Sequence, residues 1–346
     1  MKIALIELSE SHEECLYTQL CFLKQYNLEP TFFVHPKIEA QIGSYELPSQ
    51  NIRTIKPTKQ FFKRWKLLFQ LVRVLATFDK VIFNTASSSK FLRDLVLLLR
   101  FYPVECVGIL HHTKKLSASF TQRLISSKIK KYFVLADHLV PKETNGAIKI
   151  SSFYPIFFPP YPKTLLKPAD EIWICIPGGI DFKRRDYYRL LNALADKPIL
   201  KNLRFILLGK LSLSNADAVL LKESITSKKL EPYFVLFEDF VANEQFHNYL
   251  QYSDFILPLL TLNEEYLQYK ISGSFNLAHA YHKPMLAHTF FKELDDIRRN
   301  GVFYDETTLY AQLTSIATSS IPKEYHNNAQ WVLEQQSKKY VDFLMI

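Results

Sequence analysis

The 346-residue sequence predicts an α/β protein with two doubly wound domains. Short apolar runs alternate with stretches of helical periodicity from one end of the chain to the other. The alternation is interrupted at residues 153–168, where five prolines in sixteen residues exclude a regular element. Because the chain is also longer than one ordinary core of about 100 to 200 residues, we expect a separate domain on each side of this segment.

In the first half, apolar runs bounded by polar or turn residues predict buried strands. These runs are 3–6, 31–34, 80–83, 104–110 and 132–135. Between them, residues 13–25, 59–76 and 88–100 repeat apolar side chains at helical spacing. The order strand, helix, strand predicts parallel strands with helices on both faces of the sheet. Runs without polar alternation are typical of strands that are buried on both faces.

The same alternation restarts after the proline-rich segment. It predicts strands at 172–176, 204–208, 234–237, 254–257 and 285–287, and helices at 185–195, 216–226, 243–252 and 274–281. We therefore expect two Rossmann-like domains, residues 1–155 and 171–320, joined by a linker at 156–170. A final helix within 321–346 is expected to cross back to the first domain. Ligands are expected at the carboxyl ends of the strands, where the two domains would face each other across a cleft.

The net charge of +9 is unevenly distributed. Residues 1–165 contain 23 Lys and Arg against 12 Asp and Glu, whereas residues 166–346 contain 20 against 22. This asymmetry points to an anionic partner of the first domain: a membrane surface, a nucleic acid or an acidic substrate.

Residues 56–78 concentrate this charge, with six Lys or Arg and no acid before Asp79. Aromatic residues, among them Phe61, Phe62 and Trp65, lie between the cations. The pattern predicts a helix that contacts an anionic membrane surface. The alternative is an ordinary crossover helix with solvated cations, and the two descriptions are compatible.

Other classes of protein find no support in the sequence. The amino terminus lacks the pattern of a signal peptide, and no apolar run approaches the roughly 18 residues of a spanning helix. The four cysteines lack the spacing of a zinc site, and their apolar neighbours suggest reduced packing residues. No dinucleotide fingerprint or P-loop occurs. We expect a cytoplasmic protein, peripheral at the inner face of the membrane.

Glycines and cations follow the predicted strands of the second domain. The glycines are Gly178, Gly179, Gly209 and Gly273, and the cations are Arg184, Arg185 and Lys210. With the helix amino terminus expected at Ser272, Gly273 and Ser274, they suggest a diphosphate site. The alternatives are plain turn glycines and a solvated basic edge.

The order of these motifs resembles the second domain of GT-B glycosyltransferases, particularly the family 4-like group. Pro177-Gly178-Gly179 is followed by Arg185-Asp186, by a strand ending in Leu208-Gly209-Lys210, and by the run from Tyr252 to Pro258. A helix ending in His282-Lys283-Pro284 and the run from Gly301 to Asp305 complete the pattern. The resemblance covers residues 171–313 well and the first domain only in outline.

This resemblance implies transfer of a sugar from a nucleotide-sugar donor held by the second domain. Arg185 or Arg184, together with Lys210, would neutralise the leaving diphosphate. The backbone of Glu238 to Phe240 would contact the nucleobase, and Ser272, Gly273 and Ser274 would cap the diphosphate.

The chain departs from the family at the residue that binds the ribose. The family's glutamate falls at Leu277, and the neighbouring Asn276 offers only a weaker hydrogen bond. No metal or other cofactor is expected, since Asp295 and Asp296 look like solvated helix residues. We expect Arg185→Ala or Lys210→Ala to abolish transfer and to leave the fold intact.

Three histidines of the first domain are candidates for catalysis. His12 follows the first strand and would act as a general base on an acceptor hydroxyl. A carboxylate of the same turn could also act as the general base. The alternative is a structural role, because Ser11 and Glu14 have the spacing of a capping box at the start of a helix. His111 and His112 follow the apolar run 104–110, where GT-B enzymes often place a histidine near the donor sugar.

The sequence therefore favours a metal-independent glycosyltransferase that acts on a glycan or lipid-linked acceptor in surface polysaccharide or glycolipid synthesis. A nucleotide-sugar epimerase, or a non-catalytic partner that binds sugar nucleotides, is the first alternative. A nucleic-acid-binding protein is the second, although the sequence has no known nucleic-acid-binding signature and we expect no nucleic-acid partner.

Overall fold

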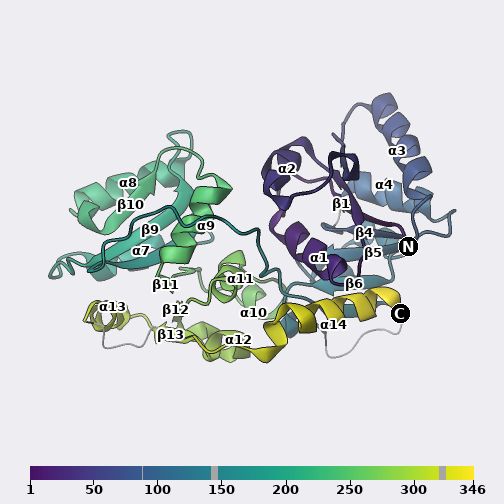
Figure 1. Ribbon diagram of the computed structural model, residues 1–346. Helices are drawn as coiled ribbons and strands as arrows, with labels where there is room; N and C mark the ends of the chain where they lie inside the picture. Colours follow the sequence, from purple (N-terminus) through teal and green to yellow (C-terminus); the bar gives the residue numbers. More distant parts are fainter. Residues whose placement is uncertain (88, 142–146, 319–324) are drawn as a thin grey trace. The chain divides into compact units, whose positions relative to one another are not determined.

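The computed structural model describes residues 1–87, 89–141, 147–318 and 325–346 (Figure 1). The chain divides into two compact units. Unit 1 comprises Met1–Pro159, Gln268–Ile271 and Asn328–Ile346, and unit 2 comprises Pro160–Leu267 and Ser272–Asn327. Among the described residues, no helix is both long enough and apolar enough to cross a bilayer.

Unit 1 contains a parallel sheet with the strand order β3-β2-β1-β4-β5-β6-β7. Its strands are β1 (Ile3–Glu7), β2 (Pro30–Val34), β3 (Ile52–Thr54), β4 (Lys80–Phe83), β5 (Glu105–Leu110), β6 (Lys131–Val134) and β7 (Lys149–Ser152). β1 lies in the middle, paired with β2 on one side and with β4 on the other. Helices cover both faces, so side chains on both faces of the inner strands are apolar.

The helices of unit 1 either connect consecutive strands or, at the C-terminal end of the chain, follow unit 2. They are α1 (Glu14–Lys24), α2 (Pro36–Gln41), α3 (Phe61–Leu75), α4 (Lys90–Leu99), α5 (Lys115–Ala118), α6 (Phe120–Ile125) and α14 (Leu333–Met345). α3 packs against α4, and α4 against α6. The C-terminal helix α14, yellow in Figure 1, packs against α1. The hydrophobic core of unit 1 therefore includes residues from both ends of the chain.

Unit 2 contains a second parallel sheet, with the order β10-β9-β8-β11-β12-β13. Its strands are β8 (Ile172–Pro177), β9 (Leu203–Lys210), β10 (Phe234–Phe237), β11 (Phe255–Ile256), β12 (Met285–His288) and β13 (Gly301–Tyr304). Its helices are α7 (Tyr187–Leu194), α8 (Ala216–Ser227), α9 (Asn243–Tyr252), α10 (Glu265–Gln268), α11 (Gly273–Ala280), α12 (Asp295–Arg298) and α13 (Leu309–Ala317). The last residue of α10, Gln268, belongs to unit 1.

The predicted α/β class with two parallel sheets is confirmed. The pattern missed β3 and β7, because these short edge strands contain polar residues instead of an apolar run. No helix or strand lies between Ser152 and Ile172, and the division between the units falls at Pro159–Pro160, inside the predicted linker.

The C-terminal helix runs from Leu333 to Met345, inside the expected range of 321–346. Residues 321–324 lie outside the described residues. Before the helix, the Asn328 side chain accepts a hydrogen bond from the backbone N–H of Gln330 and caps a short 3-10 turn, Ala329–Trp331, so the helix starts only after this turn.

Candidate functional site

Two glycines hold the carboxyl ends of β8 and β9 close together in unit 2. Gly178 has a φ of +105°, and a Cβ atom there would lie 2.6 Å from Nη2 of Arg185. A Cβ atom on Gly209 would lie 2.5 Å from the carbonyl oxygen of Gly178. Around Gly179 and Gly273, in contrast, a Cβ atom would meet nothing within 4 Å. These two open glycines are where a ligand could approach the backbone.

Arg185 is a buried structural residue, only 6% exposed. Its guanidinium donates hydrogen bonds to the carbonyl oxygens of Pro177 and Pro258, and thereby joins the turns that follow β8 and β11. Removal of the side chain would leave both buried carbonyls without this donor. In contrast to the expectation from the sequence, we therefore expect Arg185→Ala to destabilise unit 2.

Arg184 and Lys210 are exposed cations at this edge. Within the described ranges, neither side chain has an ion-pair partner. Thr261 fixes the loop that carries Arg184, because its backbone N–H donates to the Arg184 carbonyl (3.0 Å) and its hydroxyl donates to the Lys183 carbonyl (3.0 Å). Lys210 is the last residue of β9. The edge thus presents two uncompensated positive charges beside the glycine turn.

The amino terminus of α11 lies at the same edge, because α11 connects β11 to β12. Ser272 is the N-cap, and its hydroxyl accepts a hydrogen bond from the backbone N–H of Ser274 (3.4 Å). In the first turn, Asn276 is 4% exposed, and its Oδ1 has no hydrogen-bond partner among the described residues. A buried acceptor without a donor is costly, and a ligand hydroxyl could satisfy it.

Glu238 and Phe240 follow β10 and project into solvent. The side chain of Glu238 is 81% exposed and its carboxylate lies 3.5 Å from Nζ of Lys222. Phe240 is 66% exposed. The carboxyl ends of β8 to β11 therefore collect every residue that the sequence assigned to the donor, although Arg185 is turned inward.

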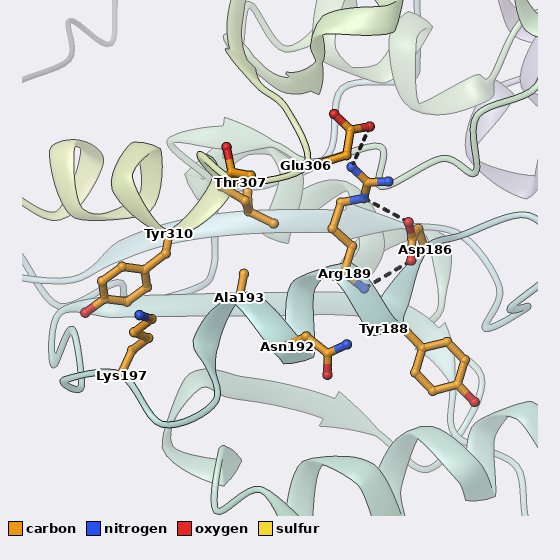
Figure 2. A pocket seen from close by; sticks show the side chains of 10 residues that line it. Asp186, Tyr188, Arg189, Asn192, Ala193, Lys197, Glu306, Thr307 and Tyr310 are labelled. Atoms are coloured by element: carbon orange, nitrogen blue, oxygen red, sulfur yellow. Dashed lines mark hydrogen bonds and ion pairs between the residues drawn. The ribbon is translucent and has the colours of Figure 1, made fainter.

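A groove of about 460 Å³ lies between α7 and α13 (Figure 2). Arg189 is its central cation, and it pairs with Asp186 (2.9 Å) and Glu306 (3.5 Å). Glu306 also lies 3.0 Å from Nε2 of His288. Because acids already compensate Arg189, the groove is a poor site for a diphosphate, and none of the predicted donor residues lines it.

In unit 1, a buried carboxylate organises the carboxyl edge of the sheet. Glu7, the last residue of β1, is 1% exposed and accepts hydrogen bonds from Asn84 Nδ2 (2.8 Å) and the Thr85 hydroxyl (2.6 Å). Asn84 also donates to the carbonyl of His12 (2.8 Å) and accepts from Gln19 Nε2 (2.7 Å). This network holds the turn after β1 against the turn after β4.

The structure brings two of the three predicted catalytic histidines together. The rings of His12 and His111 stack with centroids 3.8 Å apart. His12 has a φ of +74°, an unusual conformation for a residue other than glycine, and its Nδ1 lies 3.2 Å from Oε1 of Glu14. His111 Nε2 lies 2.8 Å from the carbonyl oxygen of Asn84. Since a carbonyl only accepts, His111 carries a proton on Nε2.

The environment separates the pKa values of the two histidines. Burial, with the nearby charge of His12, lowers the pKa of His111 to about 4. Burial also opposes the charged form of His12, but the carboxylate of Glu14 outweighs it and raises the pKa of His12 above 6.5. Burial and the Glu14 charge raise the pKa of Glu13 to about 7. Such separated values are typical of acid–base sites.

The capping-box alternative for this turn is wrong. α1 begins at Glu14 and its N-cap is Glu13, which makes no side-chain capping hydrogen bond. The Ser11 hydroxyl contacts that of Ser9, and Glu14 turns to His12. The left-handed conformation of His12 redirects the chain between Ser11 and α1, so the capping geometry cannot form.

His112 lies apart from the other two histidines. Its ring stacks on Tyr269, with centroids 6.1 Å apart and planes at 10°. The backbone N–H of Thr113 donates to the Tyr269 carbonyl (2.8 Å), so the segment Gln268–Ile271 is tied to unit 1 at this point. His112 thus packs against this segment and does not join the stacked pair.

Sequence reasoning did not assign Asn84, Thr85 or Tyr269. The sequence could have indicated Asn84 and Thr85. They directly follow the apolar run of β4, and the other candidate site residues also follow strands. Tyr269 had none, since no local pattern shows that Gln268–Ile271 joins unit 1.

No protein-family model and no curated protein matches this chain. Solved structures do match it. HepE from Anabaena, in complex with UDP and glucose, has 16% identity and a TM-score of 0.70, with 99% of each chain covered. A glycosyltransferase from Rickettsia africae has 13% identity and a TM-score of 0.65, with 99% of this chain and 93% of that chain covered.

Epimerases share the same architecture. The UDP-GlcNAc 2-epimerase from Methanocaldococcus jannaschii has 11% identity and a TM-score of 0.61, with 99% of each chain covered. At these identities the likeness concerns the fold. The chain therefore has a GT-B glycosyltransferase-like fold, as the sequence predicts.

Proposed function

We propose that the protein is a glycosyltransferase that moves a sugar from a nucleotide-sugar donor to a glycan or lipid-linked acceptor. The observation that carries this proposal is the carboxyl edge of the unit 2 sheet. There, the open Gly179 and Gly273 lie beside exposed, unpaired cations, Arg184 and Lys210, and the amino terminus of α11. The structure of HepE with UDP-glucose supports a sugar nucleotide as the ligand of this edge.

In the proposed reaction, the acceptor oxygen forms a bond to the anomeric carbon of the sugar, and the bond from that carbon to the diphosphate breaks. The leaving nucleoside diphosphate takes the electron pair. Arg184, Lys210 and the free N–H groups at the start of α11 would stabilise its charge. In this proposal, these groups stabilise the charge of the leaving diphosphate without a metal ion. Arg185 acts indirectly, since it positions the turn that carries Gly178.

The remaining donor residues have separate tasks in this proposal. The backbone from Glu238 to Phe240 would contact the nucleobase. The unpartnered Oδ1 of Asn276 would accept a hydrogen bond from a hydroxyl of the donor, where the related family uses a carboxylate.

In unit 1, His12 is proposed to accept the proton of the acceptor hydroxyl. Glu14 orients its ring and stabilises the imidazolium that forms. His111 stacks on this ring and stays neutral at physiological pH, because its pKa is lowered to about 4. His112 is the weakest of the predicted catalytic residues, since its ring packs on Tyr269.

We further propose that the acceptor belongs to surface polysaccharide or glycolipid synthesis, at the cytoplasmic face of a membrane. The excess positive charge of the first half supports an anionic surface as a partner. The four unpaired cysteines are compatible with a reducing compartment.

The test is to incubate the purified protein with a panel of nucleotide sugars and glycan or lipid-linked acceptors, and to measure the nucleoside diphosphate that is released. A glycosyltransferase releases it in step with glycosylated product. If no donor yields nucleoside diphosphate or product with any acceptor, the transfer proposal fails.

A nucleotide-sugar epimerase is the second candidate function. It is favoured by the likeness to UDP-GlcNAc 2-epimerases and by Leu277, where the related family has an acid. In the same incubation, an epimerase that completes its reaction changes the sugar and releases no nucleotide, so NMR of the sugar nucleotide separates the two. A protein that binds the donor and changes nothing would be a non-catalytic partner.

A further inference from the structure

The outer side of α3 exposes aromatic side chains that the core of unit 1 does not need. Leu68, Leu71, Val72 and Leu75 are the buried residues of this helix. On another side, Phe62 is 85% exposed and Phe69 is 53% exposed. These two residues are seven positions apart, so they lie on one face, two turns from each other. Phe61, at the start of the helix, is 65% exposed.

The exposed rings are held against one another. The ring centroids of Phe61 and Phe62 lie 5.5 Å apart, those of Phe61 and Trp65 lie 6.3 Å apart, and those of Trp65 and Phe69 lie 6.0 Å apart. The rings therefore form a continuous row along the helix. Exposed aromatic rows of this kind mark interaction surfaces more often than isolated exposed residues do.

Cations flank the row without acids to neutralise them. Lys63, Lys66 and Arg73 are exposed, and none has an ion-pair partner in the part of the chain that the structure describes. Lys66 and Arg73 are also seven positions apart, next to the face of Phe62 and Phe69. Arg64 differs, because it pairs with Asp94 of α4 and so fastens α3 to its neighbour.

We infer that the face of α3 formed by Phe61, Phe62, Lys63, Lys66, Phe69 and Arg73, here termed the α3 surface, binds the anionic surface of a lipid bilayer. Aromatic rings settle at the level of the lipid headgroups, and the cations contact the lipid phosphates. Positive charge and aromatic rings also occur in proteins that bind single-stranded nucleic acid, but there the rings line a groove. Phe62, at 85% exposure, protrudes from the helix instead.

The α3 surface begins at the functional edge of unit 1. α3 connects β3 to β4, so it runs opposite to the parallel strands, and Phe61 lies at the end where the strands finish. His12 and His111 follow strands at that same edge. A lipid anchored beside Phe61 would present its headgroup to this edge. Vesicle binding needs no donor, so this inference stands or falls independently of sugar transfer.

The experiment measures binding of the full chain to vesicles of phosphatidylcholine with phosphatidylglycerol, and to vesicles of phosphatidylcholine alone. Trp65 provides a local signal, because the other tryptophans, Trp173 and Trp331, are 7% and 8% exposed. We expect brominated lipid in the anionic vesicles to quench tryptophan fluorescence of the wild type. Trp65→Phe should lose most of this quenching while it still cosediments with the vesicles.

Two variants test the surface itself. Lys63→Gln, Lys66→Gln and Arg73→Gln combined should weaken binding to the anionic vesicles about a hundredfold. Phe62→Ser combined with Phe69→Ser should abolish quenching. The matched controls are Lys201→Gln, Lys228→Gln and Lys229→Gln, which remove the same charge from unit 2, and Phe101→Ser, which removes an aromatic ring that is 84% exposed on another part of unit 1.

The inference is overturned if the wild type fails to bind anionic vesicles, or if the charge variant binds them as tightly as its control. It is also overturned if the protein binds a single-stranded oligonucleotide and not the vesicles. Circular dichroism should show the same fold for every variant, because the side chains replaced in the surface and control variants are exposed and the half-buried Trp65 is replaced by another aromatic residue.

Discussion

Two adjacent glycines allow the stability of unit 2 and its proposed ligand binding to be tested separately. Gly178 has a φ of +105° and no room beside Arg185, whereas Gly179 faces open space. We expect Gly178→Ala to lower the free energy of unfolding by about 2 kcal/mol, because it adds backbone strain and displaces the Arg185 guanidinium. Thermal or chemical denaturation measures this loss.

The Gly179→Ala variant is the matched partner of this experiment. Its methyl group meets nothing in the unliganded protein, so stability should change by less than about 0.5 kcal/mol. If a diphosphate approaches the backbone here, affinity for a nucleoside diphosphate should fall about tenfold. Unchanged affinity in Gly179→Ala would remove this turn from the site.

The carboxylate of Glu14 sets the ionisation of His12. Because a negative neighbour favours the imidazolium, Glu14 raises the pKa of His12 against the effect of burial. A general base must be neutral, so activity should be lost as pH falls through this raised pKa. Glu14→Gln removes the negative charge, and the acidic limb of the kcat/KM profile should therefore move to lower pH. The plateau rate should fall roughly tenfold or more, because His12 loses its orienting partner.

Glu10→Gln is the control for this prediction. Glu10 lies in the same turn, but its carboxylate pairs with Lys37 and not with His12. Its pH profile should match that of the wild type. An acidic limb that stays in place in Glu14→Gln would show that His12 is not the base.

The sequence assigns the candidate site residues to turns that follow strands, but it does not show how the side chains within these turns are arranged. His12 and His111 were both assigned because each follows an apolar strand. Their stacking depends on the order of the strands, since β4 lies between β1 and β5. Likewise, an antiparallel bridge to Leu260 turns Arg185 inward while Arg184 stays exposed. Contacts between such distant residues leave no local pattern in the sequence.

At the level of elements, α14 completes the core of unit 1 from the far end of the chain. Tyr340 is fully buried, its ring stacks on Phe133 with centroids 4.4 Å apart, and its hydroxyl donates to Gln19 Oε1 (2.9 Å). We expect Tyr340→Ala to destabilise unit 1 by about 4 kcal/mol, the cost of a large cavity. Tyr340→Phe should cost about 1 kcal/mol, because Gln19 loses its donor.

Chemical denaturation followed by tryptophan fluorescence measures both losses, since Trp331 lies in unit 1 and packs near Tyr154. Tyr188→Ala provides the control, because Tyr188 is 49% exposed on α7 of unit 2. Equal stability of Tyr340→Ala and Tyr188→Ala would show that α14 is dispensable for unit 1.

Elements with a strong apolar pattern were predictable, including the edge strand β10 of unit 2, whereas the polar edge strands of unit 1 were not. The inner strands and α3, α4, α8 and α9 follow from periodicity alone, because burial on a sheet requires apolar residues at fixed spacing. β3 and β7 lie at the two edges of the sheet in unit 1 and contain Arg53, Lys149 and Ser151, so their hydrogen bonds to the neighbouring strands define them.

For the whole molecule, our proposals assign the positively charged residues behind the net charge of +9 to two different ligands. Unit 2 has a few fixed cations, Arg184 and Lys210, at the end of its sheet. The first half carries the excess, and the α3 surface concentrates part of it beside exposed aromatic rings. Salt should therefore weaken vesicle binding strongly, because that contact is spread over exposed charges.

The overall architecture does not by itself select the reaction, because glycosyltransferases and epimerases with this fold match the chain over almost its whole length. Which reaction the protein catalyses depends on the side chains and backbone groups at the carboxyl edges of the unit 1 and unit 2 sheets. Both candidate reactions begin with a sugar nucleotide, so binding of such a ligand by unit 2 is the central claim.

The most direct test of this claim is the thermal stability of the wild type and of Arg184→Ala/Lys210→Ala in the presence of UDP, other nucleoside diphosphates and their sugar conjugates. A ligand at a hundredfold excess over its Kd should stabilise the wild type by about 2.7 kcal/mol. The double variant should have the unliganded stability of the wild type, since both side chains are exposed, and should lose this ligand-dependent shift. A wild type that no nucleotide stabilises, or a double variant that is stabilised equally, would contradict the account.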